Sequence, residues 1–259
     1  MDRTSRVVFA VLLIVVAAPA LALVIRALGP VWFFPNIVPS GNAVQRFTED
    51  FGGGRLWRAA GTSVALATLT GAGGTVLALI AARSLARARR GLRHVAEAGA
   101  LLPVVMPPIA LGVGVHVLAL QLHVSGSLVG VLGAHLIPAA GYVTLYLLGV
   151  FSAYEWALED EARTLGAGRV QVWTRVTLPL LRARLAEAVL LGALVSWGQL
   201  ALTLVVGGGA VRTLPVELLA FLRSGDDHLA AVAALLLSIP PAAGVAVLAR
   251  GMRSTGGVV

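Results

Sequence analysis

Six long apolar segments constrain this chain more than any other feature. Each is more than 20 residues long, and a membrane-spanning helix needs about 20 mostly apolar residues. They cover approximately residues 7–28, 57–82, 95–122, 128–151, 185–206 and 229–249. Only 12% of the residues are charged, compared with about 25% in soluble domains. The chain is therefore expected to be an all-α integral membrane protein with six transmembrane helices, which excludes a disordered chain and a soluble globule.

The basic residues predict how the chain is oriented. All 20 are Arg, and most of them flank the apolar segments, where they indicate topology rather than nucleic-acid binding. If the N-terminus is cytoplasmic, 14 Arg lie inside and 6 outside. Because basic residues favour the cytoplasmic side, we expect both termini and the segment 152–184 to lie there, in a multi-pass protein.

Two absent residue types narrow the possible functions. Without Lys, the chain has no Walker A motif to bind nucleotide phosphates. Without Cys, it has no disulfide, thiolate metal site or Cys nucleophile. The five His show no ligand spacing for a metal. We therefore expect neither an enzyme nor a metal protein.

The N-terminal segment allows two interpretations. Arg3 and Arg6 precede an apolar run that ends near Ala20-Leu21-Ala22, which is also the outline of a secretory signal peptide. The run is long enough to cross a membrane, so an uncleaved first span is favoured. Residues 1–56 then form the first helix and an external loop rich in Pro and Gly, and residues 57–250 form a core of five helices.

The segment 152–184 has its own predicted structure. Its first part places Leu158, Ala162 and Leu165 on one helix face, with acidic residues in the first turns. Gly166 follows, where a glycine lets the chain leave a helix in the left-handed region. A second helix is expected to end at Leu178-Pro179. Its amphipathic character fits either a segment lying on the membrane surface or a docking site for another protein.

This segment resembles the EAA loop of bacterial type I ABC importer permeases. The family pattern is Glu-Ala-Ala, three residues, Gly, nine residues, then Ile-x-Leu-Pro. Gly166 matches the Gly, and nine residues later the chain has Val-Thr-Leu-Pro. Asp160 and Ala162 fit the Glu-Ala-Ala positions, Glu161 departs from the pattern, and Glu159 fits a preceding acidic residue. The matching residues are Glu159, Asp160, Glu161, Ala162, Gly166, Val176, Leu178 and Pro179.

The resemblance covers roughly residues 57–249 and implies an importer subunit of the bacterial plasma (inner) membrane. In that family the loop forms coupling helices that sit in a groove of a separate ATPase, which binds ATP and Mg²⁺. It implies further partners: a second permease subunit, identical or a sister chain, and an extracytoplasmic solute-binding protein. No cofactor is expected on this chain, and no nucleic acid is expected as a partner.

A second stretch is similar to permeases for iron(III), thiamine, sulfate, molybdate and polyamines. It comprises residues 196–199, Thr203 and residues 213–216, with residues 34–40 adding a weaker likeness to the thiamine and polyamine branch. Those permeases often have Gly-Glu-Phe where this chain has Gly198-Gln199-Leu200, so the match does not identify the solute.

Polar residues within the spans are candidates for the translocation path, because polar groups in hydrocarbon tend to face a cavity or another helix. The candidates of the fifth span are Ser196, Trp197, Gln199 and Thr203, and further candidates are His116, His135 and Tyr142. The alternative for each is an interhelical hydrogen bond, which is favoured for those outside the fifth span.

Two other classes of protein remain as alternatives. An ion-gradient-driven secondary transporter or small channel often shows inverted repeats and buried carboxylates, which the sequence does not display. A polytopic membrane enzyme would need clustered acidic residues or a nucleophile within a span, and none is present.

Overall fold

The computed structural model describes residues 3–29, 40–41 and 54–255. These residues form helices joined by turns, as the apolar segments predict. Most of the predicted external loop, including residues 34–39, lies outside the described residues. The chain divides into two compact units: Met1–Thr62 with Arg212–Val259, called unit 1, and Ser63–Val211, called unit 2. Helix α3, Arg55–Ala86, begins in unit 1 and continues into unit 2.

In unit 1, helix α12 packs against both α1 and α11. The helices are α1 (Arg3–Leu28), α11 (Leu214–Ser224) and α12 (Asp227–Thr255). The carboxylate of Glu217 on α11 is buried, accepts a hydrogen bond from Arg55 at 2.6 Å and pairs with Arg212 at 3.1 Å. Because a buried carboxylate requires paired cations, this cluster fixes the start of α3 to α11.

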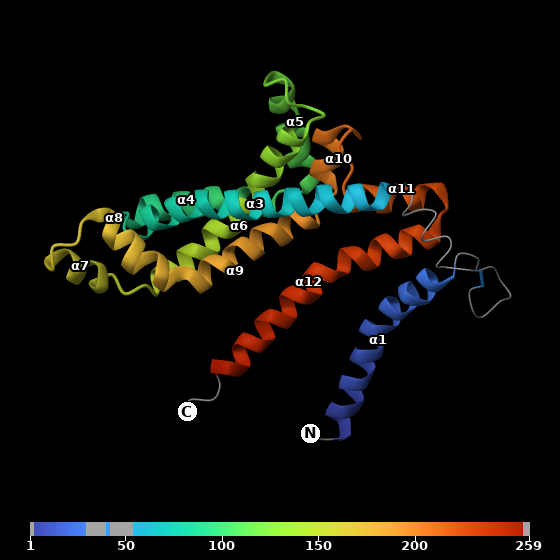
Figure 1. Ribbon diagram of the computed structural model, residues 1–259, viewed down its shortest axis with the longest axis horizontal. Helices are drawn as coiled ribbons and strands as arrows, with labels where there is room; N and C mark the ends of the chain where they lie inside the picture. The colour runs from blue at the N-terminus through green and yellow to red at the C-terminus, as the bar shows by residue number, and fades with distance from the viewer. Residues whose placement is uncertain (1–2, 30–39, 42–53, 256–259) are drawn as a thin grey trace. The chain divides into compact units, whose positions relative to one another are not determined.

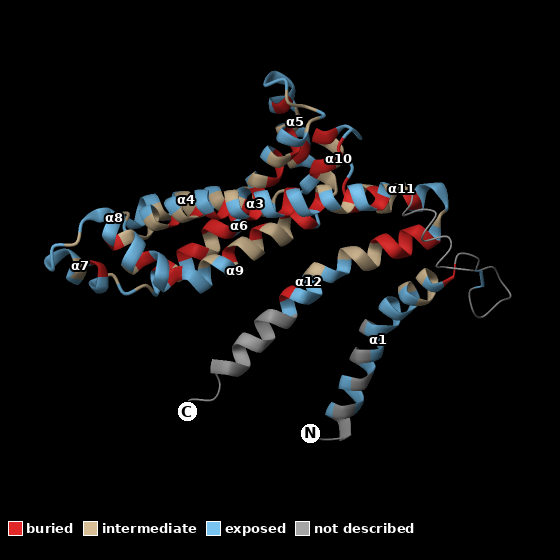
Figure 2. Cartoon of the chain, viewed as in Figure 1, coloured by how far each residue is buried: buried red, intermediate tan, exposed pale blue. Residues whose placement is uncertain are grey.

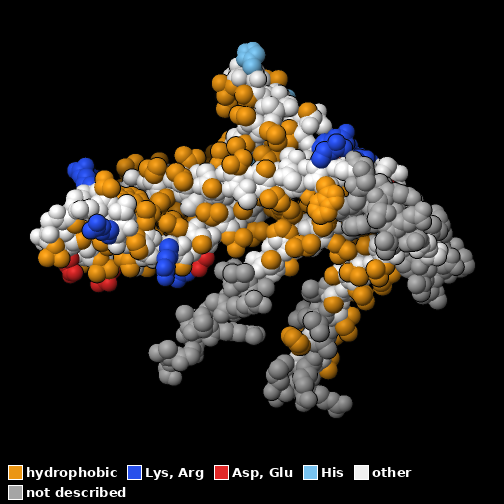
Figure 3. Space-filling model, in the orientation of Figure 1, with side chains coloured by type: hydrophobic (Ala, Val, Ile, Leu, Met, Phe, Trp, Pro, Cys, Tyr) orange, Lys and Arg blue, Asp and Glu red, His pale blue; other side chains and the backbone are white. Residues whose placement is uncertain are grey.

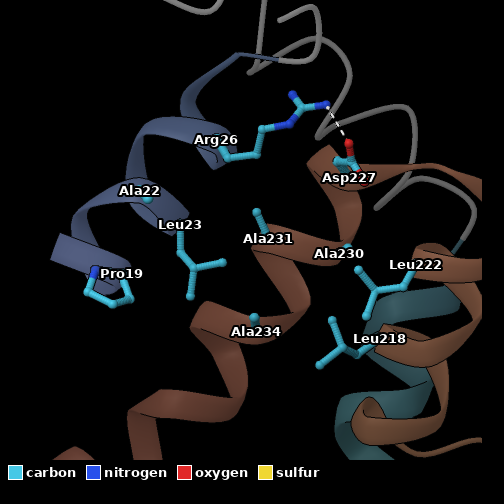
Figure 4. Close-up of a pocket in the computed structure, with 10 residues that line it drawn as sticks. All are labelled: Pro19, Ala22, Leu23, Arg26, Leu218, Leu222, Asp227, Ala230, Ala231 and Ala234. Carbon is cyan, nitrogen blue, oxygen red and sulfur yellow. Dashed lines mark ion pairs between the residues drawn. The ribbon is translucent and has the colours of Figure 1, made fainter. Parts of the chain in front are cut away.

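Unit 1 also contains an apolar groove of about 650 Å³ between α1, α11 and α12. Leu23, Leu218 and Leu222 point into it, and Arg26 and Asp227 form an ion pair of 3.8 Å at one end (Figure 4). In a bilayer, lipid tails or another helix can cover such a surface.

Unit 2 is built around helix α6. Helices α4 and α9 pack along α6, and α5 and α10 pack against each other, with α10 also contacting α6. Their bounds are α4 (Arg90–Val105), α5 (Pro108–Gln121), α6 (Leu128–Ser152), α9 (Leu178–Trp197) and α10 (Ala201–Gly207). Figure 2 shows buried residues concentrated along the inner sides of these helices. One apolar core joins α3, the second half of α6 and α9, and another joins α3, α5, the first half of α6 and α10.

Helices α3 and α9 approach each other closely at two glycines. A Cβ on Gly71 would lie 2.5 Å from the backbone oxygen of Val189, and one on Gly192 would lie 3.1 Å from the Cα of Gly71. Small residues allow such backbone contact between membrane helices. Any larger residue at Gly71 would therefore force α3 and α9 apart.

The described helices fit multi-pass membrane insertion. Helices α3, α6 and α12 are long and apolar enough to cross a membrane, and the number rises to five if each of two bent helix pairs counts as one span. Helix α1 covers the first predicted span, and its segment Ala17–Leu28 is apolar.

The third and fifth predicted spans are broken rather than continuous. Helices α4 and α5 meet at 103°, where Met106 is extended and precedes Pro107-Pro108. The residue before a proline avoids the helical region, which explains the break. The fifth span bends by 64° between α9 and α10, around Gly198. Hydropathy alone predicts two straight helices, because it does not register a change of direction.

Candidate functional site

The segment between α6 and α9 contains two short helices separated by a tight turn. Helix α7 is Ala157–Thr164, and α8 is Arg169–Val172. The Gly166 N–H donates to Arg163 O at 2.9 Å, the Ala167 N–H donates to Ala162 O at 3.0 Å, and Gly166 has φ +87°. These two bonds form a Schellman motif with glycine at the left-handed position. The predicted helix stop at Gly166 is confirmed.

The carboxylate of Glu159 is the centre of this segment. It is fully buried, and the Arg83 guanidinium donates to its two oxygens, both at 2.7 Å. Thr177 donates to it at 2.8 Å and Tyr154 at 3.1 Å. Arg87 and Arg163 lie 3.4 and 3.6 Å away. Glu159 therefore joins α7 to the end of α3 and to the residue that precedes α9.

Electrostatics explain why this buried carboxylate stays ionised. Burial alone would raise the pKa of Glu159, but hydrogen bonds from Arg83 and Thr177 outweigh that effect and lower the pKa to about 2. The pKa of the Tyr154 hydroxyl is raised, first by its burial. The cluster therefore carries charge at ordinary pH. We call it the charged joint, because it connects α7 with α3 and with the start of α9.

Aromatic rings hold the two arginines in place. The Arg83 guanidinium lies 4.5 Å from the centre of the Trp173 ring, and that of Arg87 lies 4.0 Å from the Trp156 ring. Trp156 also stacks on Phe151 at 5.7 Å. Such cation–π contacts add to the ion pairs. The sequence does not reveal this cluster, because Arg83 is one of the arginines that indicate topology, and the match of Glu159 to the EAA loop does not identify its partners.

The second half of the segment departs from its prediction. We expected a helix that ends at Leu178-Pro179, but α8 continues through a π-helical turn, η1 (Trp173–Thr177), directly into α9. The Leu178 N–H donates to Trp173 O, the spacing of a π turn. Pro179 then occupies the first turn of α9, where its missing N–H costs little. The proline therefore begins a helix here instead of ending one.

The predicted loop residues fall into two groups. Glu159 is buried and Val176 half-buried, whereas Asp160, Glu161, Gly166 and Pro179 are exposed. The apolar side chains of Leu165 and Val170 are also exposed, at 89% and 74%. On the face seen in Figure 3, most acidic side chains of unit 2 lie at the end that carries α7. The segment therefore has a buried anchor and an exposed, partly apolar tip.

The candidates for the translocation path lie largely inside unit 2. Ser196 and Thr203 are buried and contact the His135 ring at 2.8 and 2.9 Å, which is the interhelical bonding expected for His135. Trp197 is also buried, and Gln199 is half-buried. His116 lies 3.5 Å from Ser125 within the same unit, and Tyr142 is exposed. Their role in a path stays a prediction.

Known proteins with similar sequences are transport permeases. No family model matches the chain. The chain is 31% identical to the molybdenum transport system permease protein ModB of Mycobacterium tuberculosis, over 93% of this chain and 90% of the relative. It is 27% identical to the diacetylchitobiose uptake system permease protein DasC of Streptomyces coelicolor, over 82% of this chain and 76% of the relative. It is 31% identical to a probable molybdenum ABC transporter permease protein of Haloferax volcanii, over 70% of each chain.

Solved structures support the same fold. One chain of a bacterial ABC transporter involved in the import of the acidic polysaccharide alginate matches with a TM-score of 0.68 at 18% identity, over 97% of this chain and 98% of that one. A second alginate transporter structure, in complex with an alginate pentasaccharide-bound periplasmic protein, gives 0.67 at 13% identity, over 93% and 91%.

Fold and sequence together define a multi-pass membrane permease. The chain belongs to the family of ABC importer permeases, type I, as the segment 152–184 predicts. It is a subunit that forms the translocation pathway of an importer.

Proposed function

We propose that the segment 152–184 couples this permease to a separate ATPase subunit. The docking element is the exposed end of α7 at Leu165 and Gly166, called the α7 tip. ATP binding and hydrolysis on that subunit, which would hold ATP and Mg²⁺, would then move α7 and change the access of the pathway. No nucleotide chemistry is assigned to this chain.

The observation that carries the proposal is the contrast within α7. Its buried face is fixed by Glu159 to Arg83 of α3 and to Thr177 at the start of α9. Its other end exposes Leu165, beside the Schellman turn. A rigid base with an exposed apolar tip suits helix-in-groove docking, because a force on the tip reaches α3 and α9 without being absorbed by a flexible linker.

Charge on the same surface supports a protein partner. A polar hollow of about 630 Å³ is lined by Arg87, Arg163 and Arg169 next to the turn after α7. Asp160 lies nearby and pairs with Arg163 at 3.1 Å. Charged groups around an apolar contact steer and orient a protein partner of complementary charge.

The proposed topology has six spans with both termini and the 152–184 segment in the cytoplasm, in the inner membrane of a bacterium. The distribution of 14 Arg inside and 6 outside supports this orientation. The proposed assembly adds a second permease, either a second copy or a sister chain, and an extracytoplasmic solute-binding protein. The alginate transporter, which was solved with a periplasmic protein, supports the latter.

For the solute, we propose a molybdenum oxyanion as the first to test. Relatives named for molybdenum transport match this chain at 31% identity, one of them over 93% of this chain. This proposed solute is tested by measuring the uptake of molybdate in proteoliposomes, with sulfate and diacetylchitobiose as competitors. Uptake of the sugar but not of molybdate would overturn it.

The docking proposal is tested with the tagged permease and the ATP-hydrolysing subunit that co-purifies with it. Leu165→Ser is expected to lose most of that subunit and of the ATPase activity. Val95→Ser is the matched control, because Val95 is an apolar residue of α4 with a similar exposure of 71%. Full co-purification and full ATPase activity with Leu165→Ser would overturn the proposal.

A further inference from the structure

The two broken spans meet through their short halves. Helices α5 and α10 lie beside each other, and both contact α6 (Figure 1). A Cβ on Gly112 of α5 would already contact Val205 of α10 at 3.4 Å. The Gly126 N–H, just before α6, donates to Val206 O at 2.9 Å. Broken backbone is tolerated at membrane depth only within protein or beside water. The break before α10 therefore depends on the groups that surround it.

His135 of α6 bridges the break between α9 and α10. Its Nδ1 lies 2.8 Å from Ser196 Oγ at the end of α9, and its Nε2 lies 2.9 Å from Thr203 Oγ1 at the start of α10. All three side chains are buried, with His135 only 1% exposed. One planar ring therefore contacts both sides of a 64° bend.

The direction of each hydrogen bond follows from the geometry. Thr203 Oγ1 also lies 2.7 Å from the backbone oxygen of Gln199, which can only accept. The Thr203 hydroxyl thus donates to Gln199, and its oxygen accepts from His135 Nε2–H. Both ring partners are hydroxyls, and an unpaired buried charge would be costly, so the ring is neutral. Its Nδ1 then accepts from the Ser196 hydroxyl.

We propose that His135 is a positioning residue of the translocation pathway. Its ring sets the angle between α9 and α10, and α10 in turn holds α5, so that both half-spans keep one arrangement relative to α6. The proposal rests on the chain being a permease, and it is independent of whether α7 docks on an ATPase.

Removing the ring is expected to loosen the bend without unfolding the chain. In its absence, the Ser196 hydroxyl can bond to a carbonyl of the preceding turn, as serines in helices do, and Thr203 keeps its bond to Gln199. His135→Leu fills the space without polar atoms. His135→Gln restores one donor and one acceptor on a planar group.

The test measures the bend directly. The chain has no natural cysteine, so a spin-label pair can be placed at Ala186→Cys on α9 and Ala210→Cys after α10, both at exposed positions. The permease, purified with its co-purifying ATP-hydrolysing subunit, is expected to give one narrow distance distribution. His135→Leu and Thr203→Val should broaden it, and His135→Gln should restore it.

The functional readout is the amount of solute transported per ATP hydrolysed, with molybdate as the first probe. We expect about a fivefold loss in His135→Leu, within the range by which positioning residues alter coupling, and recovery in His135→Gln.

Thr70→Val is the matched control, because Thr70 is a buried threonine whose hydroxyl has no partner among the described residues. An unchanged distribution in His135→Leu, or in Thr203→Val if the former does not assemble, would overturn the proposal. So would a His135→Gln variant as broad as His135→Leu.

Discussion

Two buried polar clusters hold opposite ends of α9, and they differ in charge. The Glu159 cluster reaches Thr177, the residue before α9, and consists of a carboxylate with three arginines nearby. The His135 cluster reaches Ser196 near the end of α9 and contains only a neutral ring and hydroxyls. A single helix of 20 residues therefore connects the proposed docking segment to the broken spans.

The difference follows from the surroundings of each cluster. Glu159 lies outside the long apolar helices, where arginines with exposed flanks can supply positive charge; Arg87 and Arg163 are 41% and 42% exposed. His135 lies within α6, which is apolar enough to span a membrane. Hydrocarbon makes an unpaired charge very costly, so a joint at that depth is built from neutral donors and acceptors. Removing one partner of the charged joint leaves a buried charge uncompensated, so this joint is expected to be the more sensitive to mutation.

The largest effect is expected from removing Arg83. Arg83→Gln leaves a buried carboxylate with weaker partners, and breaking such a pair costs about 3 kcal/mol. We expect a smaller loss in Glu159→Gln, because two of the arginines left behind, Arg87 and Arg163, are exposed to water. Unfolding in detergent measures both variants.

Arg169→Gln is the control for that comparison, since Arg169 is exposed and has no ion pair in the described part of the chain. Equal stability of Arg83→Gln and Arg169→Gln would contradict the anchoring role of Glu159.

Acid should weaken the charged joint and spare the neutral one. The pKa of Glu159 is lowered from 4.5 to about 2, so its contribution to stability is complete above its ordinary pKa and is lost as the pH falls toward 2. The stability difference between wild type and Glu159→Gln should therefore shrink between about pH 5 and about pH 3. A difference that is constant over this range would show that the pKa of Glu159 is the same in the folded and the unfolded chain, which would contradict its pairing with Arg83.

A smaller effect is expected at the turn after α7. Gly166 has φ +87°, and an added Cβ would meet nothing within 4 Å, so Gly166→Ala costs only backbone strain, about 1 kcal/mol. Gly166→Asn should cost less, because Asn adopts the left-handed region more readily. Thermal unfolding compares the two; equal losses would argue against strain as the cause.

The smallest effect is expected in the neutral cluster. Thr203→Val removes one hydroxyl from the His135 network and should cost about 0.6 kcal/mol, an average for hydrogen bonds between membrane helices. Thr70→Val should cost nothing, because its buried hydroxyl has no partner among the described residues. A loss in Thr203→Val as large as in Arg83→Gln would reverse the ranking of the two clusters.

The sequence predicts the helices and the position of one turn, but not the joints between them. Apolar length alone identifies α3, α6 and α12, and the glycine at 166 marks the end of α7 because the left-handed conformation is a local property. The bends at Met106 and Gly198 were not predicted, since hydropathy does not register a change in the direction of a helix. The pairing of Arg83 with Glu159 joins residues 76 positions apart, and the contact of His135 with Ser196 joins residues 61 apart. Neither contact has a local pattern in the sequence.

The most direct measurement is a cross-link from the α7 tip. The chain has no cysteine of its own, so Leu165→Cys places a single thiol at the proposed docking surface, and Val95→Cys places one at a similarly exposed position on α4. With a short bifunctional reagent, we expect Leu165→Cys to cross-link to the co-purified ATP-hydrolysing subunit and Val95→Cys not to. Equal cross-linking from both positions, or none from Leu165→Cys in an intact complex, would contradict the proposal that α7 couples this permease to its ATPase.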